Sequence, residues 1–134
     1  MSEVERQYHF ATDDGVVEDL RRCRREDRHA FDQFVVFIQE LRNDIRLCEQ
    51  LIDETYSDDV ISLIDPLRDL QSERLNVYIV KLYAIGPWRV LTAGDHRSRK
   101  VAILAILHRS EAYSAASIER LRKSYEKLGF TKLG

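Results

Sequence analysis

Three strand-like runs in the second half of the chain constrain its fold more than any other feature. They span residues 77–83, 88–93 and 101–107, and each is rich in β-branched, aromatic or aliphatic residues. The Gly86-Pro87 turn signal separates the first two, and the polar segment 94–100 separates the last two. Two short loops joining three apolar runs predict an antiparallel meander. The third run has almost no polar alternation, which is expected of a central strand covered on both faces.

Apolar residues in the first half recur at steps of three and four, the spacing of an amphipathic helix. The pattern starts near Val16 and is strongest from residue 30 to about residue 55, and no glycine or proline interrupts residues 16–65. It predicts two helices packed antiparallel, with one long bent helix as the alternative. The apolar stripe predicts contact with the sheet, and a homodimer seam through the N-terminal helices is the other interpretation. The stripe consists of Phe34, Phe37, Ile38, Leu41, Ile45, Cys48, Leu51 and Ile52.

Shorter segments complete the predicted fold. Residues 5–11 suit a short edge strand, whereas residues 57–59 suit the cap of a short helix that Pro66 ends. A final helix follows the meander and closes at Gly129. We therefore expect a single domain over residues 1–134, of the α/β (α+β) class. Its N-terminal helices pack on one face of a small twisted antiparallel sheet, and a C-terminal helix follows the sheet.

The net charge of −2 hides an asymmetry between the two halves. Residues 1–73, predicted to be mainly helical, carry nine Lys or Arg and nineteen Asp or Glu. Residues 74–134, which hold the predicted sheet and the last helix, carry twelve Lys or Arg and four Asp or Glu. A basic half at the strand-rich end is the electrostatic pattern expected of a nucleic-acid site. The alternative is that the two halves pair their charges with each other.

Other residue types narrow the function classes. Cys23 and Cys48 form no metal-type pair, and two cysteines in predicted helices suit a reduced, cytoplasmic setting. The four histidines lack ligand spacing, so we expect neither a metal nor a cofactor. No apolar run approaches the roughly 18 residues of a membrane span, and the first ten residues contain no signal-peptide core. We expect a cytoplasmic protein that contacts no membrane.

Basic and aromatic residues at the strand ends are the best candidates for chemistry. Lys81, Arg89, His108, Arg109 and Tyr113 supply the groups needed to cut RNA through its own 2′-hydroxyl. Arg and Lys stabilise extra negative charge on the phosphate, His carries protons near neutral pH, and an aromatic ring stacks on a base. By spacing alone, these residues more simply fit solvated charges on an open sheet face. Further RNA contacts are expected from Arg74, Arg97, Arg99 and Lys100.

The order of these motifs resembles the RelE/ParE superfamily, the toxins of bacterial type II toxin–antitoxin pairs. The likeness rests on VKL at 80–82, WRV at 88–90, a polar hairpin, an apolar strand and the ending HRSEAY at 108–113. It covers residues 76–113 well and the N-terminal part only loosely. RelE-like members cleave mRNA, typically on the ribosome, with basic residues at positions matching Lys81, Arg89 and Arg109. The resemblance implies that Tyr113 stacks on a base or assists proton transfer, and that His108 takes part as in some relatives.

The favoured interpretation is therefore a metal-independent mRNA endoribonuclease of the RelE-like branch. The resemblance implies a cognate antitoxin, mRNA and the ribosome as partners. The chain departs from the family in its extended N-terminal helices, in its low isoelectric point of about 6.1 and in the extra residue Pro87. Two alternatives stay open. One is a non-catalytic ParE-like toxin that binds DNA gyrase, and the other is a helical interaction protein of the same fold.

Overall fold

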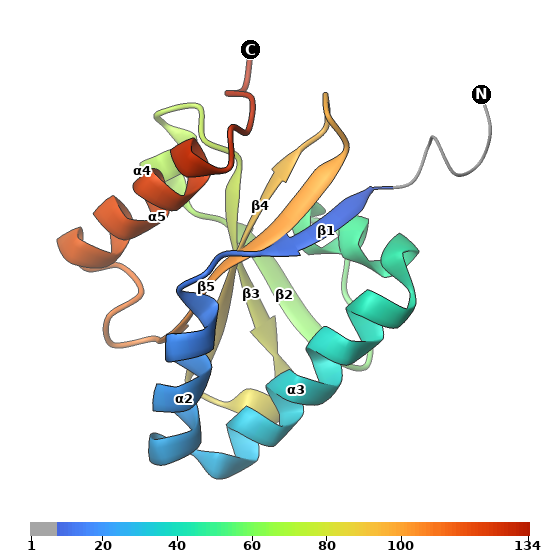
Figure 1. Ribbon diagram of the computed structural model, residues 1–134, viewed down its shortest axis with the longest axis vertical. Coiled ribbons are helices and arrows are strands. Elements are labelled where there is room, and N and C mark those ends of the chain that lie inside the picture. The colour runs from blue at the N-terminus through green and yellow to red at the C-terminus, as the bar shows by residue number, and fades with distance from the viewer. Residues whose placement is uncertain (1–7) are drawn as a thin grey trace.

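The structure is a computed structural model that describes residues 8–134, and it contains one five-stranded sheet in the order β1-β5-β4-β3-β2 (Figure 1). The strands are β1 (His9–Thr12), β2 (Ile61–Pro66), β3 (Val77–Leu82), β4 (Trp88–Asp95) and β5 (Lys100–His108). The α-helices are α2 (Val16–Glu26), α3 (Arg28–Asn43), α4 (Arg68–Gln71) and α5 (Ala115–Lys127). Two 3₁₀ helices, η1 (Ile45–Ile52) and η2 (Tyr83–Ile85), complete the described elements.

The predicted meander is present, and its strands begin and end close to the predicted positions. β3, β4 and β5 pair antiparallel in sequence order, with Val80 opposite Val90 and Val90 opposite Ile106. Residues 101–107 of β5 are all buried, as expected of a strand covered on both faces. β5 lies between β1 and β4, so it is an interior strand, although β4 takes the middle position.

The predicted edge strand is also present. β1 pairs with β5 from His9 opposite Lys100 to Thr12 opposite Ile103. Residues 5–7 of the predicted strand lie outside the described residues. Because the β1–β5 pair is parallel, the sheet is mixed rather than wholly antiparallel. The predicted α+β class is confirmed.

α2, α3 and η1 cover one face of the sheet, and α2 and α3 meet at Asp27 like the arms of a V (Figure 1). The Asp27 carboxylate accepts a hydrogen bond from the Ala30 amide at 3.1 Å and so caps α3. Asp44 caps η1 in the same way, through the Arg46 amide at 3.2 Å. The predicted region is therefore two helices followed by a 3₁₀ helix, and not one bent helix. All of the apolar stripe except Ile45 is buried here, so the stripe forms core and not a homodimer seam.

α4 and α5 cover the opposite face and bury a second core (Figure 1). Leu104 of β5 and Leu121 of α5 are both fully buried in it. α5 starts at Ser114, whose hydroxyl accepts the Ser117 amide at 3.1 Å. It closes at Gly129, where φ is 72°, a conformation that glycine adopts without a Cβ clash. Each fully buried leucine contributes roughly 1.5–3 kcal/mol, so this second layer stabilises the sheet substantially.

One predicted element is wrong, because residues 61–66 form strand β2 and not a short helix. β2 pairs antiparallel with β3, and a bulge between Ile61 and Leu63 shifts the register. The bulge places Ile61 and Ile64 in the same buried core, so their spacing of three imitates the helical period. The capping signal is present, since the Asp58 carboxylate accepts the amides of Val60 and Ile61 at 2.8 and 2.7 Å. Here it precedes a strand.

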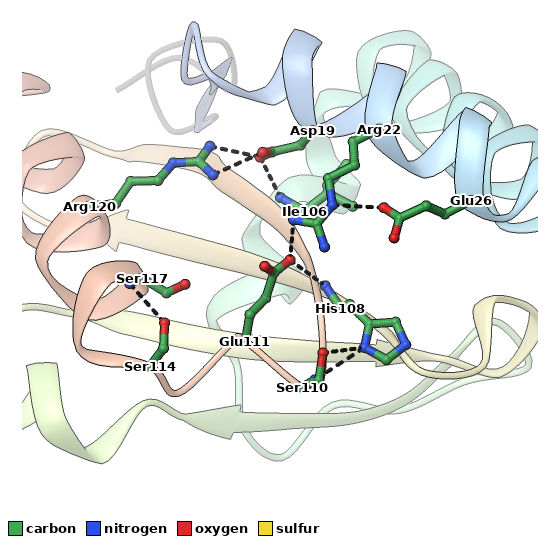
Figure 2. Close-up of polar contacts among 10 residues, drawn as sticks. All are labelled: Asp19, Arg22, Glu26, Ile106, His108, Ser110, Glu111, Ser114, Ser117 and Arg120. Carbon is green, nitrogen blue, oxygen red and sulfur yellow. Dashed lines mark hydrogen bonds and ion pairs between the residues drawn. The ribbon is translucent and has the colours of Figure 1, made fainter.

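A carboxylate of α2 completes the sheet where β1 ends. β1 stops at Thr12, opposite Ile103, so among residues 8–134 the rest of β5 has no strand beside it on that side. Asp19 Oδ2 accepts the Ile106 amide at 2.9 Å (Figure 2). Arg120 of α5 donates two hydrogen bonds to the same carboxylate, at 2.9 and 2.7 Å. A buried carboxylate needs a cation and hydrogen bonds to offset its desolvation, and Asp19 has both.

Asp95, at the end of β4, fastens the C-terminal segment to the sheet. Its Oδ2 accepts the Thr131 amide at 2.8 Å, and its Oδ1 accepts the Arg97 amide at 3.0 Å. Burial by itself would raise the pKa of the Asp95 carboxyl, but hydrogen bonds from Thr131 and Ser98 lower that pKa to about 2. The carboxylate is therefore held ionised by the amides of two loops.

We predict that Asp95→Asn lowers the free energy of unfolding at neutral pH by about 1–3 kcal/mol, because buried amides lose a charged acceptor. The folded-state pKa of about 2 lies below the unfolded value of about 3.9. The stabilising contribution of Asp95 is thus complete above about pH 4 and is lost as the pH falls toward about 2. Urea unfolding of both proteins over this range measures the effect. A stability difference that stays constant from about pH 6 to about pH 2 would contradict the prediction.

Candidate functional site

Lys81 and Arg89 lie on the sheet face that α5 covers. In the β3–β4 pair, Val80 stands opposite Val90, and both belong to the core beneath α2 and α3. Because side chains alternate along a strand, the adjacent Lys81 and Arg89 point to the opposite face. Both side chains are half-buried. Leu63, the β2 partner of Lys81, is 38% exposed, so this end of the face is only partly covered.

Arg109 reaches the same end of the sheet from the loop between β5 and α5. Its amide donates a hydrogen bond to the Pro87 carbonyl at 2.8 Å, which places it beside the β3–β4 turn. The guanidinium of Arg89 is bound to the same turn. Its Nη1 donates to the carbonyls of Gly86 and Trp88 at 2.8 and 3.0 Å. The turn that carries the extra Pro87 therefore contacts both arginines.

The charge of Arg89 responds to two neighbours. Burial lowers the pKa of the Arg89 guanidinium, Tyr113 raises it, and the positive charge of Arg109 lowers it further. The three side chains are therefore close enough to interact, although they come from β4 and from the loop after β5. An arginine stays protonated under such shifts, so Arg89 keeps its positive charge.

Tyr113, which interacts electrostatically with Arg89, also lines a cavity of about 240 Å³. The Tyr113 side chain is 60% exposed, which leaves its ring available for stacking. The lining combines the aromatic ring of Tyr113 with charged residues of both signs. The other lining residues come from the end of β2 and the start of α4: Asp65, Pro66, Leu67, Arg68 and Asp69.

The structure does not bring His108 together with Arg89. His108 stands opposite Trp88, whereas Arg89 stands opposite Leu107, so the two side chains point to different faces. The His108 ring meets the Trp88 ring edge to face, with 5.5 Å between ring centroids. Its Nδ1 accepts the Ser110 amide at 3.2 Å (Figure 2). The sheet therefore lies between the imidazole and the arginines.

The four predicted RNA-binding residues lie at the other end of the sheet. Arg74 precedes β3, and the remaining three belong to the β4–β5 loop or its edge (Figure 1). At about 3.3 Å per residue, a strand of eight residues such as β4 separates the two ends by roughly 26 Å. These four residues therefore do not belong to the same local cluster as Lys81, Arg89 and Arg109. The four are Arg74, Arg97, Arg99 and Lys100.

The acidic and basic halves pair with each other, but only in part. Three ion pairs join acidic residues before residue 74 to α5, whereas Lys81, Arg89 and Arg109 form no ion pair with any residue among 8–134. The charges of the site are thus left available for an external anion. The three pairs are Asp19–Arg120, Glu73–Arg122 and Asp14–Lys127.

The sequence did not indicate two features near the candidate site, namely the residues that line the cavity and an ion pair of Arg22. The residues of β2 and α4 that line the cavity were assigned to a helix and a linker, because the bulge in β2 disguised the strand. Arg22 belongs to the run RRCRR at 21–25, which is typical of a solvated helix face. In the structure it forms ion pairs with Glu26 on its own helix and with Glu111 after β5. No local pattern indicates the second pair, since its partners lie on distant segments.

Other chemistries find less support in the described residues. Among residues 8–134, no group of three or more His, Cys, Asp or Glu is placed to hold a metal ion. Cys23 and Cys48 are free and fully buried, and burial raises their thiol pKa values to about 12 and about 11. Both thiols therefore stay protonated and out of reach of a substrate. None of the helices in this part of the chain has the length and apolar character of a membrane span.

Comparison with known proteins gives one similar structure. No protein-family model matches this sequence, and no curated protein sequence is significantly similar to it. A chain of the archaeal RelE–RelB complex from Pyrococcus horikoshii OT3 aligns with 79% of this chain and 99% of its own length. The two chains are 20% identical, and the TM-score is 0.43.

Proposed function

We propose that this protein is a RelE-like toxin that cleaves mRNA without a metal. The observation that supports the proposal is the position of Lys81, Arg89 and Arg109 at one end of the sheet, none with an intramolecular ion pair among residues 8–134. The exposed Tyr113, which interacts with Arg89 and lines a cavity, adds an aromatic ring to this end. The motif order of residues 76–113 supports the same reaction class. Cytoplasmic RNA is the substrate class that combines phosphate charge with unstacked bases.

In the proposed reaction, the 2′-oxygen of one nucleotide bonds to the adjacent phosphorus and the bond to the 5′-oxygen breaks. The products are a 2′,3′-cyclic phosphate and a 5′-hydroxyl, so one proton leaves the 2′-hydroxyl and one reaches the 5′-oxygen. Arg89 and Arg109 stabilise the charge that builds on the phosphoryl oxygens. Lys81 supplies a further positive charge and a group able to donate a proton. Tyr113 stacks on the base that enters the cavity, which holds the backbone in line.

The partners follow from the same proposal. A cognate antitoxin neutralises the toxin, and mRNA on the ribosome is the target. The role of His108 as proton carrier finds no support in its position, since its ring lies across the sheet from Arg89. A gyrase-binding toxin and a helical interaction protein remain the outcomes to expect if no RNA is cleaved.

Binding of RNA should weaken steeply with salt. Neutralising about three phosphates of a single strand gives a slope of log affinity against log salt of about −2, because bound counterions are released. Fluorescence anisotropy of a labelled single-stranded RNA at several salt concentrations measures this slope. Salt-independent binding, or none, would favour the gyrase-binding or interaction alternatives.

Arg109→Ala should lower the cleavage rate by about a hundredfold or more, because a charge-stabilising group at the reacting phosphate is lost. Stability should change by no more than about 0.5 kcal/mol, since the side chain is exposed. Transcript cleavage with ribosomes present, alongside thermal melts, measures both effects. Arg25→Ala, which removes an exposed arginine of α2, is the matched control and should cleave like the wild type. Normal cleavage by a folded Arg109→Ala protein would show that the site is misassigned.

Tyr113→Phe should retain cleavage, whereas Tyr113→Ala should lose about tenfold or more, because stacking on a base is worth about 1–3 kcal/mol. The exposed ring beside the cavity motivates this order. Single-turnover cleavage by the three proteins measures it. If Phe loses as much as Ala, the hydroxyl transfers a proton and stacking is not its main role.

A further inference from the structure

The loop that carries Arg109 and Tyr113 is held from the opposite side of the sheet. Residues 109–114 connect β5 to α5 and supply two of the four proposed site residues. Within the loop, the Glu111 and Ala112 amides donate to the His108 carbonyl at 3.0 and 3.2 Å. These turns fix the local shape of the loop. The Arg109 amide bonds to the Pro87 carbonyl at 2.8 Å and Ala112 is fully buried, so the loop also contacts the β3–β4 turn and the core. A contact with α2 requires a side chain of the loop.

Glu111 makes that contact. Its side chain points toward α2, where it forms an ion pair with Arg22 (Figure 2). Its Oε1 also lies 3.4 Å from the His108 amide, on the β5 edge left uncovered by β1. Glu111 is the one acidic residue of the loop. Its charge is thus used to attach the loop and not to oppose the cations of the site.

Arg22 is itself held in place by its surroundings. Its Nε donates to Glu26 at 2.7 Å, and its guanidinium carbon lies 5.7 Å from the centre of the Trp88 ring. Burial of the Arg22 and Glu111 side chains is intermediate, at 37% and 31% exposed. An arginine that already lies over an aromatic ring and is paired with Glu26 loses little further entropy when it also binds Glu111. α2 therefore presents a preorganised cation to the loop.

We propose that Arg22 and Glu111 are positioning residues for the RNA site, and that their ion pair sets the place of Arg109 and Tyr113 from the far face of the sheet. The expected effect on RNA cleavage rests on the proposed function. The attachment of the loop to α2 rests on the observed contacts alone. Without the pair, the loop keeps its internal turns and the Arg109–Pro87 hydrogen bond, but it loses its attachment to α2, so the Arg109 and Tyr113 side chains shift relative to Arg89. Displacements of about 1 Å at a reacting centre cost up to about a hundredfold in rate.

The kinetic test separates positioning from general stability. Arg22→Gln and Glu111→Gln should each lower kcat about tenfold or more while KM for RNA changes less than about threefold, since neither residue touches the substrate. The double variant should be no worse than either single variant. Arg22→Lys, which keeps the charge, should recover part of the loss. Wild-type kcat in both folded single variants would overturn the proposal.

Two controls belong to the same helix. Arg21→Gln removes an arginine whose ion pair, with Glu18, stays within α2 and is largely exposed. Glu26→Gln removes the charge of the other partner of Arg22 but keeps an oxygen that accepts from Nε, and it leaves the pair with Glu111. Both controls should retain wild-type kcat. An equal loss of kcat in Arg21→Gln would mean that α2 acts through its overall charge, and the pair would have no special role.

Amide hydrogen exchange tests whether the Arg22–Glu111 ion pair holds the loop, a contact that we call the clamp, and it requires no measurement of cleavage. Arg22→Gln should raise exchange about tenfold or more at the amides of residues 108–114, whereas Arg21→Gln should leave them unchanged. If the wild type cleaves no RNA but this exchange pattern appears, the proposed function fails and the clamp stands. If the wild type cleaves RNA but the loop exchanges equally in both variants, the clamp fails and the proposed function stands.

Discussion

The structure depends on one carboxylate, that of Asp19, at the place where the sheet would otherwise be incomplete. β1 covers only the first half of β5, so the Ile106 amide would face an apolar layer without an acceptor. An unsatisfied buried amide costs about 1–3 kcal/mol, and Asp19 removes that cost. The charge then introduced is offset by Arg120 through two hydrogen bonds. The same contact joins the helical layers on both faces of the sheet. Glycine at position 15 leaves room for the Arg120 guanidinium, since a Cβ there would lie 2.7 Å from Arg120 Nη2.

The arrangement of charge has two consequences that oppose each other. Pairing between the acidic half and α5 holds the layers together, as Glu73–Arg122 and Asp14–Lys127 show. Exposed pairs of this kind contribute little each, about 0–1 kcal/mol. The cations left over at the end of β3 and β4 are the ones with potential function. A near-neutral net charge therefore coexists with a local positive site, because the two halves cancel globally and not at that end of the sheet.

Glu111 and Asp19 act by the same principle at neighbouring positions of β5. Each carboxylate lies near an amide on the uncovered edge, and each is neutralised by an arginine from another helix. The edge that a longer first strand would cover is instead closed by side chains of α2 and of the loop before α5. This arrangement keeps the edge from pairing with other chains. It also ties the loop that bears Arg109 and Tyr113 to a helix on the opposite face.

The sequence by itself determined the meander, the helical character of the region from Val16 onward, the final helix and the types of residue in the candidate site. These follow from local periodicity. The runs at 77–83, 88–93 and 101–107 are close to the observed strands, because a buried strand requires a continuous run of apolar residues. Only the tertiary structure decided the rest. The bulge in β2 changes the apolar spacing, so the strand resembles a helix until β3 is beside it. His108 and Arg109 are adjacent in sequence, yet strand alternation directs the His108 ring away from Arg89. Arg22 pairs with Glu111, which is far from it in the chain. Gly94 lies so close to Ile52 that a Cβ would be 2.2 Å from its side chain. Local sequence patterns do not encode such contacts between distant segments.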